Sequence, residues 1–302
     1  MMLLWIACAL TLAPVSASTP ALARWYVNTN VAANVEFARA NPHALTGWYG
    51  CCSLLSVNGT GAVSQKVNLS AVAHPMKAAL QPHGGPELTF HAVFSVAEAA
   101  IHSGAALGAV PELVRLAAAG GADGLLCDYE PADNYTDAHA RAYTSFLGAL
   151  VKEARAQAGA GGRALEVGLD VAGWGILDNW EVLAALDADF YTSMSPTYSG
   201  KDVARDRAFA TDYVHAVGTS RAAIGVGSMP APGFESNCAN MPDYAWNQSS
   251  LTAFAAWLKG AAGVSKIDVW RCDIDHYGET AAWFIDAIEA FLADGRSAAA
   301  YK

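Results

Sequence analysis

The sequence has few charged residues and no break that would mark a linker. Only 15% of its 302 residues are charged, whereas 53% are hydrophobic, which excludes a largely disordered chain. No stretch rich in Pro and Ser and no block of like charge divides it. At about 150 residues per domain the length permits two domains, but the missing linker favours one.

Positive charge is scarce as well. The 18 Lys and Arg residues are outnumbered by 28 Asp and Glu, for a net charge of −10. Nucleic acid and anionic membrane surfaces are therefore excluded as expected partners. Beyond the N-terminal segment no run of about 20 apolar residues lacks a charge or a break. We expect no membrane span, and a monomer.

Spacings typical of metal sites are missing too. The sequence contains no Cys-x-x-Cys and no His-x-x-x-His, so neither a metal nor a cofactor is expected. Of the six cysteines, Cys8 lies in the N-terminal segment, and the others are Cys51, Cys52, Cys127, Cys238 and Cys272. Because five is odd, at least one thiol is free or pairs between chains.

The first 23 residues have the features of a secretory signal peptide. A short apolar run, Met1–Ala13, is followed by small residues that end in Ala21-Leu22-Ala23, an Ala-x-Ala cleavage site. We predict a signal peptide over 1–23 and one domain over 24–302, in the extracellular space or a lysosome-like lumen. The alternative is a buried first strand or helix. A glycoprotein is also expected, from the Asn-x-Ser/Thr sequons at Asn58, Asn68, Asn134 and Asn247.

Short apolar runs then alternate with helical patterns. The expected strands are Trp25–Asn28, Leu45–Val57, Leu88–Val96, Gly124–Glu130, Leu165–Val171, Phe190–Met194, Ala222–Ser228 and Ile267–Cys272. Strands that alternate with helices imply parallel pairing with right-handed crossovers. Eight repeats over about 270 residues predict the α/β class, as a single-domain (β/α)₈ TIM barrel.

Three helical patterns support this arrangement. Tyr143, Phe146, Leu147, Leu150 and Val151 form one apolar stripe of helical period. The segment Pro111–Gly120 places Pro in an expected first turn and Gly at an expected C-cap. A last helix is expected over Glu279–Ala293.

The strand Gly124–Glu130 carries two acids on one face. Successive side chains of a strand alternate between its faces, so Leu126, Asp128 and Glu130 share one face, and Tyr129 lies on the other with Leu125 and Cys127. If the first face is the barrel lumen, Glu130 lies at the C-terminal mouth, where barrel enzymes keep their active sites. Two carboxyls this close do not both ionise freely, so one of them tends to keep its proton, as a general acid requires. The alternative is a structural role, in which the two acids cap a helix or form an ion pair with an arginine.

The segment Asp123-Gly-Leu-Leu-Cys-Asp-Tyr-Glu130 follows Ala-Ala-Gly-Gly-Ala and resembles the fourth-strand motif Asp-Gly-x-Asp-x-Asp-x-Glu of glycoside hydrolase family 18. This family comprises chitinases, chitobiases and endo-N-acetylglucosaminidases. Thr89–Ser95 is similar to its third strand, Asp189–Met194 to the sixth strand that leads to Met-x-Tyr-Asp, and Ile267–Trp270 to the eighth, which ends in Trp. The sequence departs from the family pattern in three places: Leu126 replaces the first acid, Tyr198 lies one or two residues late, and Ala97 and Glu98 replace the two glycines that follow the third strand.

The resemblance implies substrate-assisted retaining hydrolysis. Glu130 would protonate the glycosidic oxygen, and the acetamido carbonyl of the sugar would attack C1. Asp128 would hydrogen-bond the acetamido N–H, and Tyr198 would orient the carbonyl. With Leu126 in place of the first acid, we expect a lower pKa for Asp128 and a changed pH profile.

Further residues are candidates for binding substrate. Trp270 resembles the aromatic floor of the family site, and Met194 belongs to the sixth-strand segment. Trp174 and Asp170 follow the fifth strand, where the alternatives are helix packing for the tryptophan and a turn or cap for the aspartate. For Gly225-Val-Gly-Ser228, tight packing is favoured over phosphate binding.

Together these features predict a secreted glycosidase that hydrolyses β-linked N-acetylglucosamine-containing glycans, either chitin-type oligosaccharides or N-glycan cores. The expected partner is thus an oligosaccharide or polysaccharide substrate. Two alternatives remain: a non-catalytic chitinase-like lectin that binds oligosaccharides, and a barrel glycosidase of another sugar class.

Overall fold

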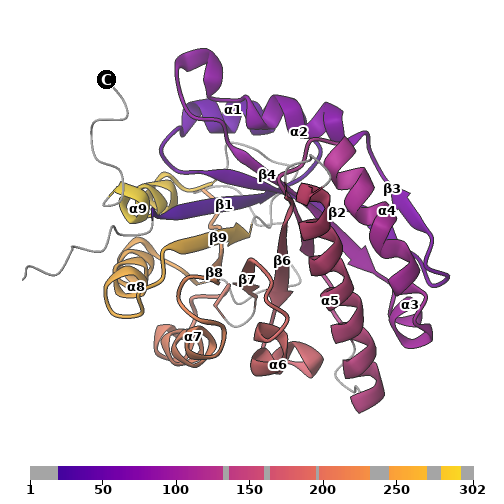
Figure 1. Cartoon of the computed structure of the whole chain (residues 1–302). Coiled ribbons are helices and arrows are strands. Elements are labelled where there is room, and N and C mark those ends of the chain that lie inside the picture. Colours follow the sequence, from indigo (N-terminus) through magenta and orange to yellow (C-terminus); the bar gives the residue numbers. More distant parts are fainter. Residues whose placement is uncertain are drawn as a thin grey trace, which may run out of the picture.

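Eight parallel strands form a closed barrel with helices around it (Figure 1). The computed structural model describes residues 20–131, 136–159, 164–194, 197–231, 245–270 and 280–293. The barrel strands are β1 (Leu22–Val27), β2 (Gly47–Val57), β4 (Thr89–Val96), β5 (Gly124–Cys127), β6 (Glu166–Val171), β7 (Phe190–Ser193), β8 (Ala222–Gly227) and β9 (Lys266–Trp270). Strand β1 pairs with both β2 and β9, which closes the barrel.

Helices connect these strands and cover the outside of the barrel (Figure 1). They are α1 (Val31–Ala40), α2 (Leu69–Lys77), α3 (Glu98–Ser103), α4 (Ala106–Ala119), α5 (Asp137–Gly159), α6 (Trp180–Ala184), α7 (Val203–Val217), α8 (Gln248–Gly260) and α9 (Ala282–Ala293), with 3₁₀ turns η1 (Gln81–His83) and η2 (Gly175–Asp178). Within the described ranges, none of them combines the length and apolar character needed to cross a membrane. The predicted single-domain TIM barrel is confirmed.

All eight strand predictions overlap the observed strands, and β2 begins two residues later than expected and ends at Val57 as expected. Strand β2 contains a bulge between Gly50 and Leu55 and a disulfide between the adjacent Cys51 and Cys52. It also pairs antiparallel with the short strand β3 (Val63–Gln65). Leu55, Ser56 and Val57 at the end of β2 thus pair with both β3 and the barrel strand β4.

The predicted start of α4 is wrong. The helix begins at Ala106, so Pro111 lies inside it and not in its first turn. Proline cannot donate a backbone hydrogen bond to the carbonyl four residues earlier, here that of Leu107. Leu107 is 44% exposed, so water can solvate that turn and the helix tolerates the proline. The predicted end is confirmed, with Gly120 at the C-cap.

The first barrel strand includes the last two residues of the expected signal peptide. Leu22 pairs with Lys266 and Ala23 with Ile267. Residues 1–19 lie outside the described residues, so the leader itself stays a prediction.

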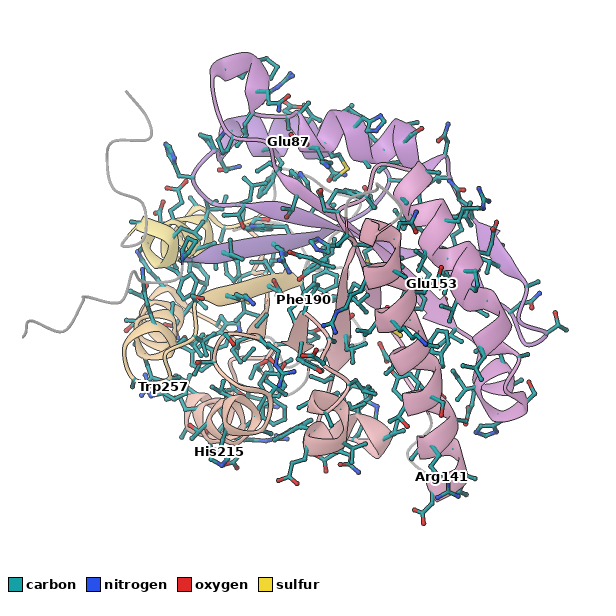
Figure 2. The ribbon with its side chains drawn as sticks, in the orientation of Figure 1. Glu87, Arg141, Glu153, Phe190, His215 and Trp257 are labelled. Atoms are coloured by element: carbon teal, nitrogen blue, oxygen red, sulfur yellow. A yellow bond between two sulfur atoms is a disulfide. The ribbon has the colours of Figure 1, made fainter. Side chains whose placement is uncertain are left out.

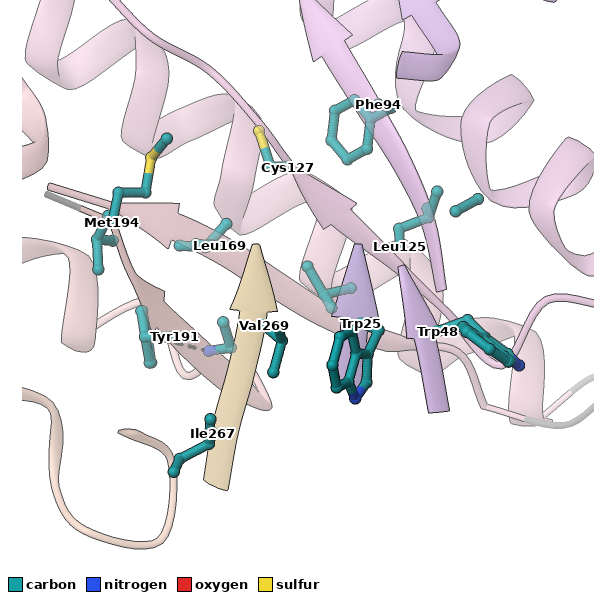
Figure 3. Packing of buried hydrophobic residues seen from close by; sticks show 14 of the residues in the cluster. Trp25, Trp48, Phe94, Leu125, Cys127, Leu169, Tyr191, Met194, Ile267 and Val269 are labelled. Atoms are coloured by element: carbon teal, nitrogen blue, oxygen red, sulfur yellow. Dashed lines mark hydrogen bonds between the residues drawn. The ribbon is translucent and has the colours of Figure 1, made fainter. Parts of the chain in front are cut away.

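The apolar residues form two layers. The larger lies between barrel and helices and includes Leu125, Cys127 and Leu169 (Figure 3). A smaller cluster fills the lumen, where Leu126 packs with Tyr26, Tyr49, Cys51, Val93 and Phe190. Phe190 lies near the centre of the molecule, whereas His215 and Trp257 lie on outer helices (Figure 2). The alternation expected for β5 is therefore observed.

A polar network also occupies the lumen. Arg24 donates to the Tyr49 hydroxyl (2.9 Å), which donates to Asp268 (3.1 Å). Arg24 also contacts Glu166 (3.4 Å), and Glu166 contacts His91 (2.8 Å). These links hold four buried polar side chains and the exposed Glu166 in fixed positions, on the N-terminal side of Tyr26.

Candidate active site

The two acids of the strand motif follow the end of β5. The Asp128 N–H donates to the Phe94 carbonyl (2.9 Å), which extends the pairing with β4 by one residue. Tyr129 turns outward, where its hydroxyl bonds to His139 Nε2 (2.7 Å) and its ring packs on Tyr143 (4.7 Å between centroids). Because side chains alternate along extended backbone, Asp128 and Glu130 face the lumen.

Asp128 is half-buried, and its Oδ1 has no hydrogen-bond partner. Burial, followed by the charge of Glu130, raises its pKa to about 6. Even with Leu126 in place of the first motif acid, Asp128 is therefore not an aspartate of ordinary acidity. Desolvation and a second carboxyl shift the equilibrium toward the protonated form.

Glu130 lies exposed at the mouth of the barrel. Partial desolvation of its carboxyl raises its pKa above the ordinary value. In the described part of the chain, Glu130 forms no ion pair with a lysine, arginine or histidine. Its carboxyl thus faces the mouth with a raised affinity for a proton, as a general acid requires.

Asp170 is the third acid of the candidate site, and it lies within β6, where it is neither a turn nor a cap residue. It is 1% exposed, and its Oδ1 accepts a hydrogen bond of 2.6 Å from the Tyr26 hydroxyl. Its Oδ2 has no partner. Burial, and next the charge of Asp128, raise the pKa of Asp170 well above its ordinary value. Asp128 and Asp170 therefore interact across the strand pair β5–β6 and do not ionise independently.

Two aromatic rings stand beside these acids. Tyr198 is stacked on Trp270 with centroids 5.7 Å apart and planes at 16°. Trp270 also packs on Tyr26, at 4.8 Å and 57°. The Tyr198 ring lies directly over Gly225, where a Cβ atom would collide with it, so Gly225 serves close packing and not phosphate binding. Together these residues place a partly buried aromatic wall next to Asp170.

The remaining candidates are less closely tied to the acids. Met194 is 4% exposed and packs in the larger apolar cluster, a position that favours packing. Trp174 is half-buried just before η2, at the C-terminal end of β6. Asn134, Cys238, Cys272 and Glu279 lie outside the described residues.

Sequence reasoning did not find Tyr26. A signal was present, because Arg24 and Tyr26 alternate with the apolar Trp25 and Val27 at the start of the expected strand Trp25–Asn28. Polar residues on alternate positions of a barrel strand point into the lumen. Their partners, however, come from strands far along the chain.

A surface pocket lined by Arg39, His43 and His83, among others, lies at the opposite end of the barrel. These residues precede β2 and β4, whereas the acids follow β5. The pocket is therefore separate from the candidate site.

Comparison with solved structures identifies the type of barrel. A class V chitinase from Pseudomonas fluorescens Pf-5 has a TM-score of 0.68 at 15% identity, over 91% of this chain and 100% of that one. A family 18 chitinase from Cycas revoluta, in a complex with allosamidin, has a TM-score of 0.62 at 14% identity, over 91% and 99%. The chain shares its fold with family 18 chitinases. No protein-family model matches the sequence, and no curated protein matches it.

One solved structure with a similar fold is named as an agglutinin and not as an enzyme. A chitinase-like agglutinin from Robinia pseudoacacia has a TM-score of 0.64 at 13% identity, over 89% of this chain and 99% of that one. At such identities the comparison shows the fold alone. The function has to be argued from the side chains of this site.

Proposed function

We propose that the protein is a glycosidase that cleaves β-linked N-acetylglucosamine-containing glycans. The observation that carries the proposal is the pair Asp128 and Glu130, which face the lumen at the C-terminal mouth and both have raised pKa values. Beside them, the partly buried Trp270, backed by the buried Tyr198, supplies an aromatic surface. Acids poised to hold a proton next to aromatic faces suit a neutral sugar better than an anionic ligand.

Glu130 acts as general acid and then as general base. It donates its proton to the glycosidic oxygen as the bond from that oxygen to C1 breaks, while the acetamido oxygen of the same sugar forms a bond to C1. The resulting oxazolinium ion is opened when water attacks C1 and gives its proton to the Glu130 carboxylate. Since the nucleophile belongs to the substrate, the chain needs no second carboxylate at nucleophilic distance.

Asp128 accepts the acetamido N–H and stabilises the positive charge of the oxazolinium ion. The Asp128 side chain is only partly buried, so a sugar bound at the mouth can reach it. Asp170 then takes over the part that the first motif acid would have played. It is a buried carboxyl on the adjacent strand, it interacts electrostatically with Asp128, and Tyr26 holds it in place. Leu126 can therefore be apolar, because the proton-sharing partner comes from β6.

The lectin alternative is supported by two observations. Leu126 packs in an apolar layer where the motif has an acid, and an agglutinin shares this fold. A lectin would bind oligosaccharide through the same aromatic surface and leave it intact. The presence of Glu130 favours the enzyme.

Glu130→Gln separates these functions, since it keeps the shape of the side chain and removes the proton donor. The variant and the wild type are incubated with chitooligosaccharides and with high-mannose N-glycopeptides, and the products are measured by mass spectrometry. Glu153→Gln on α5, outside the barrel (Figure 2), is the matched control. We expect cleavage by the wild type and the control, and a loss of at least about 100-fold in Glu130→Gln. Binding without cleavage by the wild type would establish the lectin, and no interaction with either substrate would favour another sugar class.

We also propose that the protein is secreted and glycosylated. The leader-like residues 1–23 and the sequons support this, and the described sequons Asn58, Asn68 and Asn247 are all exposed. Because Leu22 and Ala23 are paired in β1, cleavage at or before Ala21 would preserve the barrel. N-terminal sequencing of the protein secreted from eukaryotic cells, with and without treatment by a glycan-removing enzyme, tests both points.

A further inference from the structure

Three metal-ligating side chains meet on the outer side of the barrel, behind the strand that carries the acids. Glu98 and His102 belong to α3, and His139 belongs to the first turn of α5. Each offers one ligand atom, and these atoms all lie within 4.8 Å of one another. Glu98 Oε1 and His102 Nε2 are 3.6 Å apart, and the two imidazole rings are 3.9 Å apart between centroids.

The donor set indicates a transition-metal dication. Side chains four residues apart on a helix lie on the same face, which brings Glu98 and His102 together. Two imidazoles and one carboxylate are a common set of three protein ligands for Zn²⁺, with a fourth position left for water. Ligand atoms about 2.1 Å from a tetrahedral ion are roughly 3.4 Å apart, so rotamer adjustments of the two exposed side chains close the site.

Tyr129 supplies the supporting contact that metal-bound histidines require. Its hydroxyl lies 2.7 Å from His139 Nε2, which leaves His139 Nδ1 as the ring nitrogen that can bind a metal ion. His139 is 4% exposed and Tyr129 3%, so both rings are held in place by packing. The site therefore has one rigid ligand with a fixed orientation and two adaptable ones.

We propose that Glu98, His102 and His139 form a zinc site. The ion ties α3 and α5 to the outer face of the strand end through Tyr129, which lies between Asp128 and Glu130 in the chain. It thereby restrains the segment that presents Glu130 to the mouth. This site does not depend on the proposed glycosidase activity, because its ligands face away from the lumen.

The test is zinc binding by the full chain. The protein is treated with a chelator and titrated with ZnCl₂ by calorimetry, and its thermal midpoint is measured with and without zinc. We expect one ion per chain and a rise of about 5 °C at a free zinc concentration 100 times the dissociation constant.

Variants assign the ligands. His102→Ala and Glu98→Gln alter exposed side chains, so they should fold normally and weaken zinc binding at least tenfold. Tyr129→Phe, which removes only the supporting hydroxyl, should weaken it about 10–100-fold. His215→Ala, an exposed histidine on α7 (Figure 2), is the matched control and should bind zinc as the wild type does. A wild type that binds no zinc, or a His102→Ala variant with wild-type affinity, overturns the proposal.

Discussion

Replacing Asp128 by Asn should make the protein more stable and inactive. Burial and the charge of Glu130 raise the pKa of this carboxyl from its ordinary 3.8 to about 6. The two values differ by about 2, and each unit corresponds to about 1.4 kcal/mol. Ionised Asp128 therefore costs the folded state up to about 3 kcal/mol, a cost that an uncharged Asn does not incur.

The sign of this effect sets its pH window. A carboxyl whose pKa is raised on folding binds a proton more readily in the folded state, so its contribution to stability declines as pH rises from about 4 to 6. Below pH 4 the carboxyl is protonated in both states, and the variant and wild type should unfold alike. Above pH 6 the full difference should appear, as an increase in the melting temperature of about 6 °C at roughly 2 °C per kcal/mol for a chain of this size.

The assay is thermal unfolding of both proteins between pH 3.5 and 8, with hydrolysis measured on the same samples. Asp206→Asn is the matched control: Asp206 is buried in the first turn of α7, and chiefly through that burial its pKa is also raised to about 6. It should gain stability over the same pH range and retain activity. A difference between Asp128→Asn and wild type that does not vary with pH would refute the electrostatic reasoning.

Three further predictions follow from the site and its surroundings. Tyr26→Phe removes the hydrogen bond that favours the Asp170 carboxylate, so the pKa of Asp170 should rise further. We expect kcat to fall about tenfold and the pH–rate profile to move to higher pH. An unchanged profile would contradict a role for the Tyr26–Asp170 pair. Trp270→Ala should raise KM for chitooligosaccharides roughly tenfold through lost apolar contact with little change in kcat, and steady-state kinetics would show this. Asp123→Asn breaks the buried bond to Lys77 (2.9 Å) and should lower stability by about 3 kcal/mol, seen by denaturant unfolding, while the folded fraction keeps its kcat.

The sequence was sufficient to predict the architecture and the orientation of β5. Short apolar runs separated by helical stripes are local patterns, and eight of them leave few packings besides the barrel. The strict period of a strand likewise assigns Asp128 and Tyr129 to opposite faces, as observed. The start of α4 was missed because Pro in a first turn is a preference that tertiary packing overrides.

Only the tertiary structure decided how the acids interact. Tyr26 and Asp170 are 144 residues apart, and closure of the barrel brings them to 2.6 Å. The pKa of Asp128 is raised chiefly by burial within the fold, which no local motif records. The contact between His139 and His102 is also decided by the tertiary structure, because neither their spacing in the sequence nor the composition predicts it. Local order follows from the periodicity of neighbouring residues, whereas electrostatics depends on distances between remote ones, which only the folded chain defines.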